Sequence, residues 1–182
     1  MNIIKTAIEG VLIFEPRLFH DERGHFYESY RLENFTKENS QLNFVQENQS
    51  TSTFGVIRGL HFQNPPFAQA KLVRVVSGEI KDVAVDIRKD SPTYGQVVSC
   101  ILSAENKKQL LVPEGFAHGF SVLSEEATVI YKISSYYNKE AESSIHAFSQ
   151  SLDIDWEVPA DQVILSGKDK ESVEFQNFKS KF

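Results

Sequence analysis

The sequence predicts an all-β protein built as an antiparallel sandwich or barrel, and two observations carry that prediction. The first is composition, because 14 Phe and 6 Tyr among 182 residues favour a β-rich core over a helical bundle. The second is spacing, because short apolar runs recur along the chain and turn-forming residues separate them. A chain of this length suits one domain with its own core, so we expect a single domain over residues 1–182.

Each expected element follows from a local pattern. A turn is expected at 21–24, and a short helix over 32–39 because Leu32 and Phe35 lie on one side of it. The segment 41–52 is mostly polar and is given no regular element. The tail from Asp161 onward is less apolar, so we expect it to wrap the surface or form a short helix. Strands are expected at 11–14, 25–31, 55–61, 71–76, 79–88, 95–102, 109–112, 120–123 and 127–136.

Charge and cysteine content exclude several classes of protein. The formal net charge is −6 and the pI is about 5.4, so the basic face of a nucleic-acid binder is not expected. Cys100 is the single cysteine, which rules out an intrachain disulfide and fits a cytoplasmic location. The sequence has no apolar run of membrane-spanning length, so no membrane partner is expected. A small anionic ligand remains compatible with a local Arg/Lys cluster.

Strand alternation makes Tyr131 a candidate for an inward-facing functional group. Val129, Tyr131 and Ile133 share one face of their expected strand, so the phenol points inward if that face is apolar. The plainer interpretation is a core tyrosine whose hydroxyl is satisfied by a neighbour. Both interpretations stay open from the residues alone.

Lys71 is ambiguous in the same way. It shares a strand face with Val73 and Val75, and an inward lysine is rare unless it is paired. The opposite face carries Leu72 and Val76, which are also apolar, so a solvated lysine at the start of the strand fits equally well.

Two histidines lie where sites often form. His61 ends an expected strand just before a Pro-Pro loop. His118 closes a Pro-x-Gly-x-x-His run that starts at Pro113 and resembles the second motif of the cupin superfamily, whose members are double-stranded β-helix (jelly-roll) barrels. Metal cupins use a His-x-His pair, but residues 61–63 read His-Phe-Gln, so we expect no metal site.

Several motifs taken together resemble one family. Residues 19–29 are similar to F-x-D-x-R-G-x-F-x-E-S, 44–48 to F-V-Q-D-N, and 58–63 to R-G-L-H-[YF]-Q. With 113–120, 153–156 and 165–169 in the same order, the chain resembles the dTDP-4-dehydrorhamnose 3,5-epimerase family over nearly its whole length.

Three features depart from the family pattern, and they leave substrate variation open. Glu47 stands for the usual Asp, and Gln49 stands where many members have His. The segment after Asp169 is rich in Lys and Glu.

The resemblance implies a metal-free and cofactor-free proton transfer next to a ketone. It assigns His61 as base, Asp169 as the carboxylate that holds its ring, Tyr131 as acid, and Lys71 as the cation at the enolate oxygen. Histidine suits the role of base because its unperturbed pKa is near 6.5, and tyrosine suits that of acid because its reference pKa is near 10. A preorganised charge at the enolate is usually a large catalytic term.

The resemblance also implies the ligand and the assembly. The expected substrate is a dTDP-linked 4-keto-6-deoxyhexose, converted to dTDP-4-dehydrorhamnose for rhamnose and surface polysaccharide synthesis, and the expected assembly is a homodimer. Arginines suit the diphosphate because their planar fork binds phosphate oxygens in pairs, and His118 is expected to donate a hydrogen bond to the sugar. The implied binding residues are Phe19, Arg23, Phe26, Glu28, Gln46, Asn48, Arg58, His118, Tyr137 and Lys168.

Other functions remain to be separated from this one. A related 3- or 5-epimerase acting on another nucleotide-linked keto sugar would use the same acid and base. A non-catalytic sugar-binding cupin would keep the barrel but lose them, and the four implied catalytic residues together argue against it. A metal-dependent cupin oxygenase would contain bound metal, which elemental analysis detects.

Overall fold

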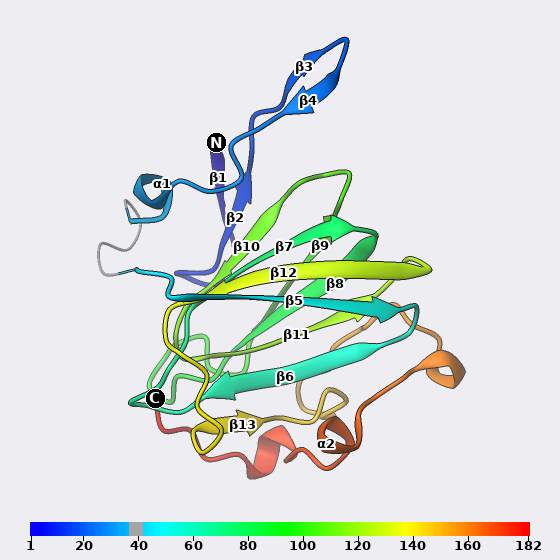
Figure 1. Ribbon diagram of the computed structural model, residues 1–182. Helices are drawn as coiled ribbons and strands as arrows, with labels where there is room; N and C mark the ends of the chain where they lie inside the picture. Colours follow the sequence, from blue (N-terminus) through cyan, green and yellow to red (C-terminus); the bar gives the residue numbers. More distant parts are fainter. Residues whose placement is uncertain (37–41) are drawn as a thin grey trace.

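The computed structural model describes residues 1–36 and 42–182, and these residues form a barrel of two antiparallel sheets (Figure 1). The first sheet has the strand order β1 (Asn2–Lys5), β2 (Leu12–Glu15), β10 (Gln109–Val112), β7 (Lys71–Ser77), β12 (Glu126–Ile133) and β5 (Gln46–Thr53). The second has the order β13 (Glu142–Ser144), β6 (Ile57–Gln63), β11 (Phe116–Val122), β8 (Glu79–Asp86) and β9 (Val97–Ser103). The predicted all-β jelly-roll barrel is confirmed.

The remaining elements lie outside the two sheets. A hairpin of β3 (Phe19–Asp21) and β4 (Gly24–Phe26) projects well beyond the barrel in Figure 1, with the predicted turn at its tip. Helix α1 (Leu32–Thr36) begins where the sequence predicts, and the expected helical positions 37–39 lie outside the described residues. The tail contains the short helices η1 (Ala160–Gln162), α2 (Gly167–Lys170) and η2 (Phe175–Asn177).

Two predictions of local structure were wrong. The strand expected over 25–31 ends at Phe26, because the chain leaves the hairpin there and runs towards α1 without a neighbouring strand. The polar segment 41–52 contains most of the eight-residue strand β5, which pairs along its whole length with β12. This segment lacks the alternation of apolar and polar residues that predicts a strand. Its inward side chains are polar and some of them line a cavity, while the outward ones are exposed.

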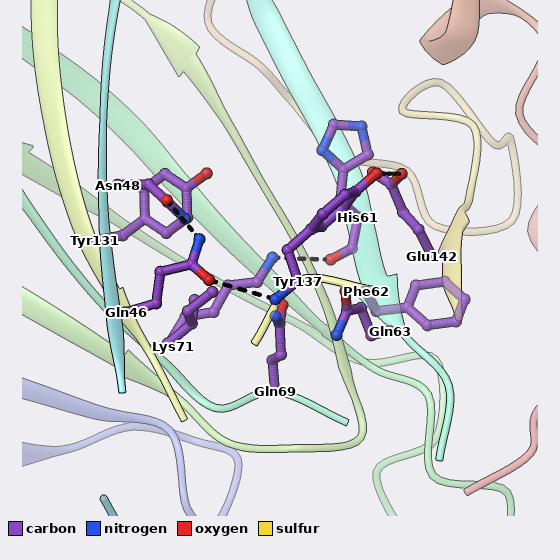
Figure 2. A pocket seen from close by; sticks show the side chains of 11 residues that line it. Gln46, Asn48, His61, Phe62, Gln63, Gln69, Lys71, Tyr131, Tyr137 and Glu142 are labelled. Carbon is purple, nitrogen blue, oxygen red and sulfur yellow. Dashed lines mark hydrogen bonds between the residues drawn. The ribbon is translucent and has the colours of Figure 1, made fainter. Parts of the chain in front are cut away.

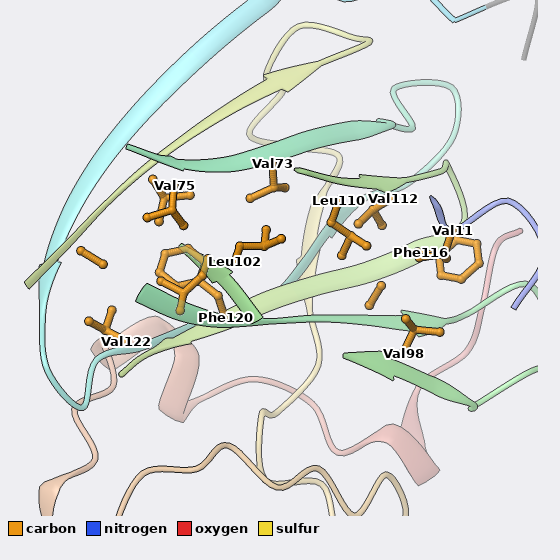
Figure 3. Packing of buried hydrophobic residues seen from close by; sticks show 14 of the residues in the cluster. Val11, Val73, Val75, Val98, Leu102, Leu110, Val112, Phe116, Phe120 and Val122 are labelled. Carbon is orange, nitrogen blue, oxygen red and sulfur yellow. The ribbon is translucent and has the colours of Figure 1, made fainter. Parts of the chain in front are cut away.

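Three apolar layers hold the barrel. The interior layer fills the space between the two sheets, where residues such as Val73, Leu102 and Phe120 interdigitate (Figure 3). A second layer covers the outer face of the first sheet with the segment around α1, through Phe35. A third covers the outer face of the second sheet with the tail, through Trp156 and partly buried aromatic residues. The tail therefore wraps the surface, as predicted, and seals one sheet.

The interior changes from apolar to polar along the barrel. Val73 and Val75 lie in the interior layer, and Lys71 on the same face of β7 is also buried, with 8% of its surface exposed. Tyr131 packs against this layer from β12. The inward interpretation of both side chains therefore holds, and the polar end of the interior positions the site described below.

A close backbone approach joins β6 to β11 beside the polar end. Gly59 has φ +134°, and a Cβ built there would lie 2.5 Å from the Cα of Gly119. The ladder between these strands shifts register in the same place, between His118 and Phe120. Glycine is required at position 59 because a side chain would both strain the backbone and push β11 away.

We expect Gly59→Ala to lower the free energy of unfolding by about 1–3 kcal/mol or more, because backbone strain and a steric clash act together. Gly24→Ala is the matched control, since Gly24 also has positive φ, at +126°, but no atom within 4 Å of the added Cβ. Urea unfolding of both variants measures the difference. If both variants lose the same free energy of unfolding, the close approach of β6 to β11 adds no cost beyond backbone strain.

Candidate active site

A cavity of about 360 Å³ opens at the polar end of the barrel, between the two sheets (Figure 2). Polar side chains dominate its wall, and they come from both sheets and from the loops beside them. The lining residues are Gln46, Asn48, His61, Phe62, Gln63, Gln69, Lys71, Tyr131, Ile133, Tyr137 and Glu142.

His61 on β6 forms a pair with Asp169 on α2. The Nε2 atom of His61 lies 2.5 Å from Oδ1 of Asp169, a carboxylate with only 4% of its surface exposed. Burial would raise the pKa of Asp169, but hydrogen bonds from His61 and Ser166 outweigh burial and lower this pKa, so the group is a carboxylate. A carboxylate only accepts hydrogen bonds, so the neutral imidazole carries its proton on Nε2. Nδ1 is then the nitrogen that is free to take a proton.

Asp169 is itself fixed by the start of α2. Ser166 precedes this helix and accepts a hydrogen bond from the backbone N–H of Asp169, while its hydroxyl donates to the second carboxylate oxygen at 2.8 Å. The Leu-Ser-Gly-Lys-Asp segment therefore acts as a cap that aims one oxygen at His61.

Tyr131 lies on the opposite wall from His61. It belongs to β12 in the first sheet, whereas His61 belongs to β6 in the second, and both side chains line the cavity (Figure 2). A proton acceptor and a phenol on opposing sheets are able to address two faces of one bound molecule.

Lys71 is the buried cation of the cavity. Its ammonium donates a hydrogen bond to the backbone oxygen of His61 at 3.1 Å. Burial lowers the pKa of Lys71 to about 8, and the negative charges of Asp82 and Glu142 partly offset this effect. An ammonium in this place is able to stabilise an oxyanion, and it titrates close to neutral pH.

A second histidine–aspartate pair, His118 and Asp82, lies deeper in the interior. Its Nε2 and Oδ1 atoms are 2.8 Å apart, and both residues are buried. Burial lowers the pKa of His118, so the ring is neutral and donates its Nε2–H to Asp82. In this form the Nδ1 atom of His118 is an acceptor, and donation of a hydrogen bond from His118 to the sugar stays a prediction. Sequence reasoning missed Asp82, although it shares a strand face with the core residues Ile80 and Ala84.

A second cavity of about 380 Å³ lies on the other side of His61 and carries two cations, Arg58 and Lys168. Lys168 forms an ion pair with Glu142, whose Oε2 atom also accepts a hydrogen bond from the Tyr137 hydroxyl at 2.8 Å. His61 and Glu142 line both cavities, so the cations lie directly beside the candidate base. The sequence offered no signal for Glu142, which is the first residue of the three-residue strand β13.

The first cavity also contains the predicted binding residues Gln46, Asn48 and Tyr137. The Gln46 side chain donates to Asn48 at 2.8 Å, and its oxygen accepts from the backbone N–H of Tyr137 at 3.3 Å. Gln63 and Gln69 line the same wall and were missed, although Gln63 follows His61 by two residues on the same strand.

Five predicted binding residues do not line either cavity of their own chain: His118, which is buried with Asp82, and four residues near the N-terminus. Phe19, Arg23 and Phe26 lie on the projecting hairpin, where Phe26 is 70% exposed and Arg23 pairs with its neighbour Asp21. Glu28 lies just after the hairpin and pairs with Arg31 at 2.6 Å.

Two features are absent from residues 1–36 and 42–182. No group of three or more His, Cys, Asp or Glu side chains is placed to hold a metal ion there. No helix in the same part of the chain is long and apolar enough to cross a membrane.

The fold and the site define a class of protein: a cupin-type barrel with a proton acceptor, a phenol and a buried cation around one small-molecule cavity. The particular family follows from comparison with known proteins. The chain belongs to the dTDP-4-dehydrorhamnose 3,5-epimerase family, whose model matches residues 5–177.

Relatives of this chain support that assignment. The dTDP-4-dehydrorhamnose 3,5-epimerase of Shigella flexneri is 55% identical over 170 residues, with 93% of each chain covered. The crystal structure of the dTDP-6-deoxy-D-glucose-3,5-epimerase of Legionella pneumophila Philadelphia 1, in complex with dTDP-4-keto-L-rhamnose, matches with a TM-score of 0.93 at 48% identity. It covers 98% of this chain and 94% of that one.

A more distant structure is the 3'-monoepimerase of Streptomyces bikiniensis in complex with dTDP-quinovose. It is 31% identical, with a TM-score of 0.85, and the match covers 92% of this chain and 85% of that one. The same fold therefore occurs in enzymes described as double and as single epimerases.

We expect activity to fall as the pH rises through about 8, because Lys71 loses its proton there. Asp82→Asn removes a negative charge that raises the pKa of Lys71, so the alkaline loss of kcat/KM should move to lower pH. The exposed Asp90→Asn should leave the profile unchanged. If the alkaline loss of kcat/KM occurs at the same pH in Asp82→Asn as in the wild type, deprotonation of Lys71 is not its cause.

Proposed function

We propose that this protein converts dTDP-4-dehydro-6-deoxyglucose to dTDP-4-dehydrorhamnose by inverting C3 and C5, within dTDP-rhamnose supply for polysaccharide synthesis. The observation that carries the proposal is the arrangement of His61 and Tyr131 on opposing sheets, with the Lys71 ammonium in the wall between them. The names and ligands of the relatives agree with it.

The geometry supports an enolate mechanism. The hydrogens on C3 and C5 are acidified by the C4 ketone between them, so a base of ordinary strength removes them. His61 takes the proton on Nδ1, with Asp169 stabilising the imidazolium, and Lys71 stabilises the negative charge on the C4 oxygen. Tyr131 then donates a proton from the opposite face, which inverts the carbon. No atom changes oxidation state, so the reaction requires no redox cofactor.

The cavity beside His61 suits the diphosphate of the substrate. Arg58 and Lys168 supply two cations there, and the Arg58 Nε–H already donates to Ser52 at 2.9 Å, which orients the guanidinium. Gln46, Asn48 and Tyr137 in the first cavity provide polar and aromatic surfaces for the rest of the nucleotide.

The projecting hairpin supports a homodimer in which each chain completes the site of the other. Phe19, Arg23 and Phe26 carry aromatic and cationic groups that suit a nucleotide, yet they lie exposed outside the barrel. Exposed aromatic side chains on an extended arm favour contact with a second molecule. Symmetric dimers are the commonest assembly of identical chains, and they would place each hairpin in the partner's site.

Mixing two inactive variants tests this arrangement. His61→Asn breaks the cavity of its own chain, and Arg23→Ala breaks the hairpin that would serve the partner. A 1:1 mixture of refolded chains should recover about a quarter of wild-type activity, because half of the dimers are mixed and each has one complete site. The control mixture of His61→Asn with Tyr131→Phe should recover none, since both changes affect the same cavity. Recovery in neither mixture, with mixed dimers present, would contradict the shared site.

The acid and base are tested separately from binding. His61→Asn and Tyr131→Phe should each lower kcat by about 100-fold or more, because general acid–base catalysis typically contributes a factor of that size. Both variants should keep wild-type thermal unfolding and affinity for dTDP. Turnover close to wild type in either variant would overturn the assigned role.

Proton NMR of dTDP-4-keto-6-deoxyglucose in deuterated water tests the reaction itself. Protein-dependent entry of deuterium at C3 and C5 is the expected result. Entry at one carbon would instead support a single epimerase, the activity of the relative from Streptomyces bikiniensis. No exchange with folded protein would support another substrate or a sugar-binding role.

A further inference from the structure

Each inversion leaves the acid and the base in the wrong protonation states for the next one. When a proton has moved from the substrate to His61, and another from Tyr131 to the substrate, the site holds an imidazolium and a phenolate. This inference rests on the proposed function, in which two inversions follow on one bound sugar. The site therefore has to return a proton from His61 to Tyr131 between them.

We propose that Lys71 performs this return: its ammonium gives a proton to the Tyr131 phenolate, and the resulting amine takes the proton held by the His61 imidazolium. The first transfer yields a neutral phenol and a neutral amine, and the second yields a neutral imidazole and an ammonium. The sum moves one proton from His61 to Tyr131, with no net change at Lys71 and no other reactant.

The strand register places Lys71 beside Tyr131, and a hydrogen bond links Lys71 to the backbone of His61. β7 pairs with β12 so that Val73 lies opposite Tyr131 and Lys71 lies opposite Ile133, which puts Lys71 and Tyr131 on the same inward face one step apart diagonally. The ammonium also reaches across to β6, where it donates to the His61 backbone oxygen at 3.1 Å. Figure 2 shows this nitrogen ending between the Tyr131 ring and the strand that carries His61.

The Lys71 ammonium has hydrogen-bond donors that its contact with His61 does not use. It carries three N–H groups, and within the described part of the chain only the His61 carbonyl accepts one of them. Lys71 lines the same cavity as Tyr131 and the His61 side chain, so its remaining N–H groups are available to that cavity.

The energetic order agrees with this direction of transfer. Burial lowers the pKa of Lys71 to about 8, well below the ordinary lysine value of about 10.4. An ammonium whose pKa is lowered in this way gives up its proton more readily than an ordinary lysine does. A lysine with an ordinary pKa near 10.4 would favour the second step much less.

The neighbouring charges keep Lys71 protonated at rest. Asp82 on β8 and Glu142 on β13 attract the proton, and neutral His118 on β11 lies beside them as the partner of Asp82. The other titratable groups of this cavity are His61 on β6, Tyr131 on β12 and Tyr137, whose hydroxyl donates to Glu142. Asp82 is therefore a positioning residue that acts through Lys71.

Lys71→Arg separates the return of the proton from charge stabilisation. Arginine keeps a positive charge at the enolate, but its guanidinium does not release a proton in proteins. We expect deuterium entry at the first carbon to fall by less than about tenfold, while the second inversion falls by about 100-fold and singly inverted sugar accumulates. The second inversion should then depend on the concentration of imidazole buffer, unlike in the wild type. The surface variant Lys108→Arg should change neither step.

A rescue experiment covers the case in which arginine does not fit. In Lys71→Ala, methylammonium should restore both inversions, whereas guanidinium should restore only the first. Equal rescue of the second inversion by both compounds, or equal slowing of both inversions in a folded Lys71→Arg, would overturn the proposal and leave Lys71 as a charge only.

Measurements on the wild-type enzyme distinguish failure of the proton return through Lys71 from failure of the proposed function. Exchange at neither carbon in the wild type contradicts the function itself. If the wild type exchanges one carbon only, the same comparison is made between the first turnover and later ones, because the return is then needed once per turnover.

Discussion

Burial of the Lys71 ammonium is the constraint on which the rest of the site depends. A charge taken out of water is costly unless hydrogen bonds and opposite charges compensate for it. Here the His61 carbonyl and the buried carboxylate of Asp82 supply that compensation. Asp82 in turn needs His118, because a fully buried carboxylate requires its own donors. One inward lysine thus accounts for the buried pair of Asp82 and His118 in an otherwise apolar part of the barrel.

The two-sheet architecture converts this polar end into a two-faced site. β6 and β12 belong to different sheets, so inward side chains on them approach a ligand from opposite sides. The close contact of Gly59 with Gly119 fixes how near β6 lies to β11, and therefore where His61 stands relative to the His118 pair. Inversion of a carbon needs this opposition, and a single sheet face would not provide it.

The sequence predicted the barrel strands well where one face was apolar. The bounds of the strand 109–112 and the start of the strand at Lys71 were predicted correctly, because turn-forming residues flank the apolar runs at these positions. β5 was missed because the alternation of burial along it does not appear as an alternation of residue type. Its inward positions include Gln46 and Asn48, which line the cavity and are not part of the apolar core.

The site was predictable to the extent that its chemistry lies in local motifs. His61, Tyr131, Lys71 and Asp169 were expected together from the family resemblance, and the structure brings them to one place. Glu142 and Asp82 were missed because an acidic residue on a strand resembles solvated surface until the fold shows what it packs against. The hairpin residues show the opposite limit, since their motif is clear but they line neither cavity of their own chain.

The neutral and charged forms of the site groups impose an order on the reaction. In the proposed mechanism, Asp169 as a carboxylate favours the imidazolium that would form when His61 takes a proton, which would assist the first transfer. The same stabilisation makes the imidazolium slower to give the proton back, and a site that acts twice on one sugar needs a group that can recover it. The group has to be a weaker acid than the imidazolium and a stronger one than the phenol. Among the side chains that line the cavity, a buried lysine meets this condition, and its burial is what brings it into that range.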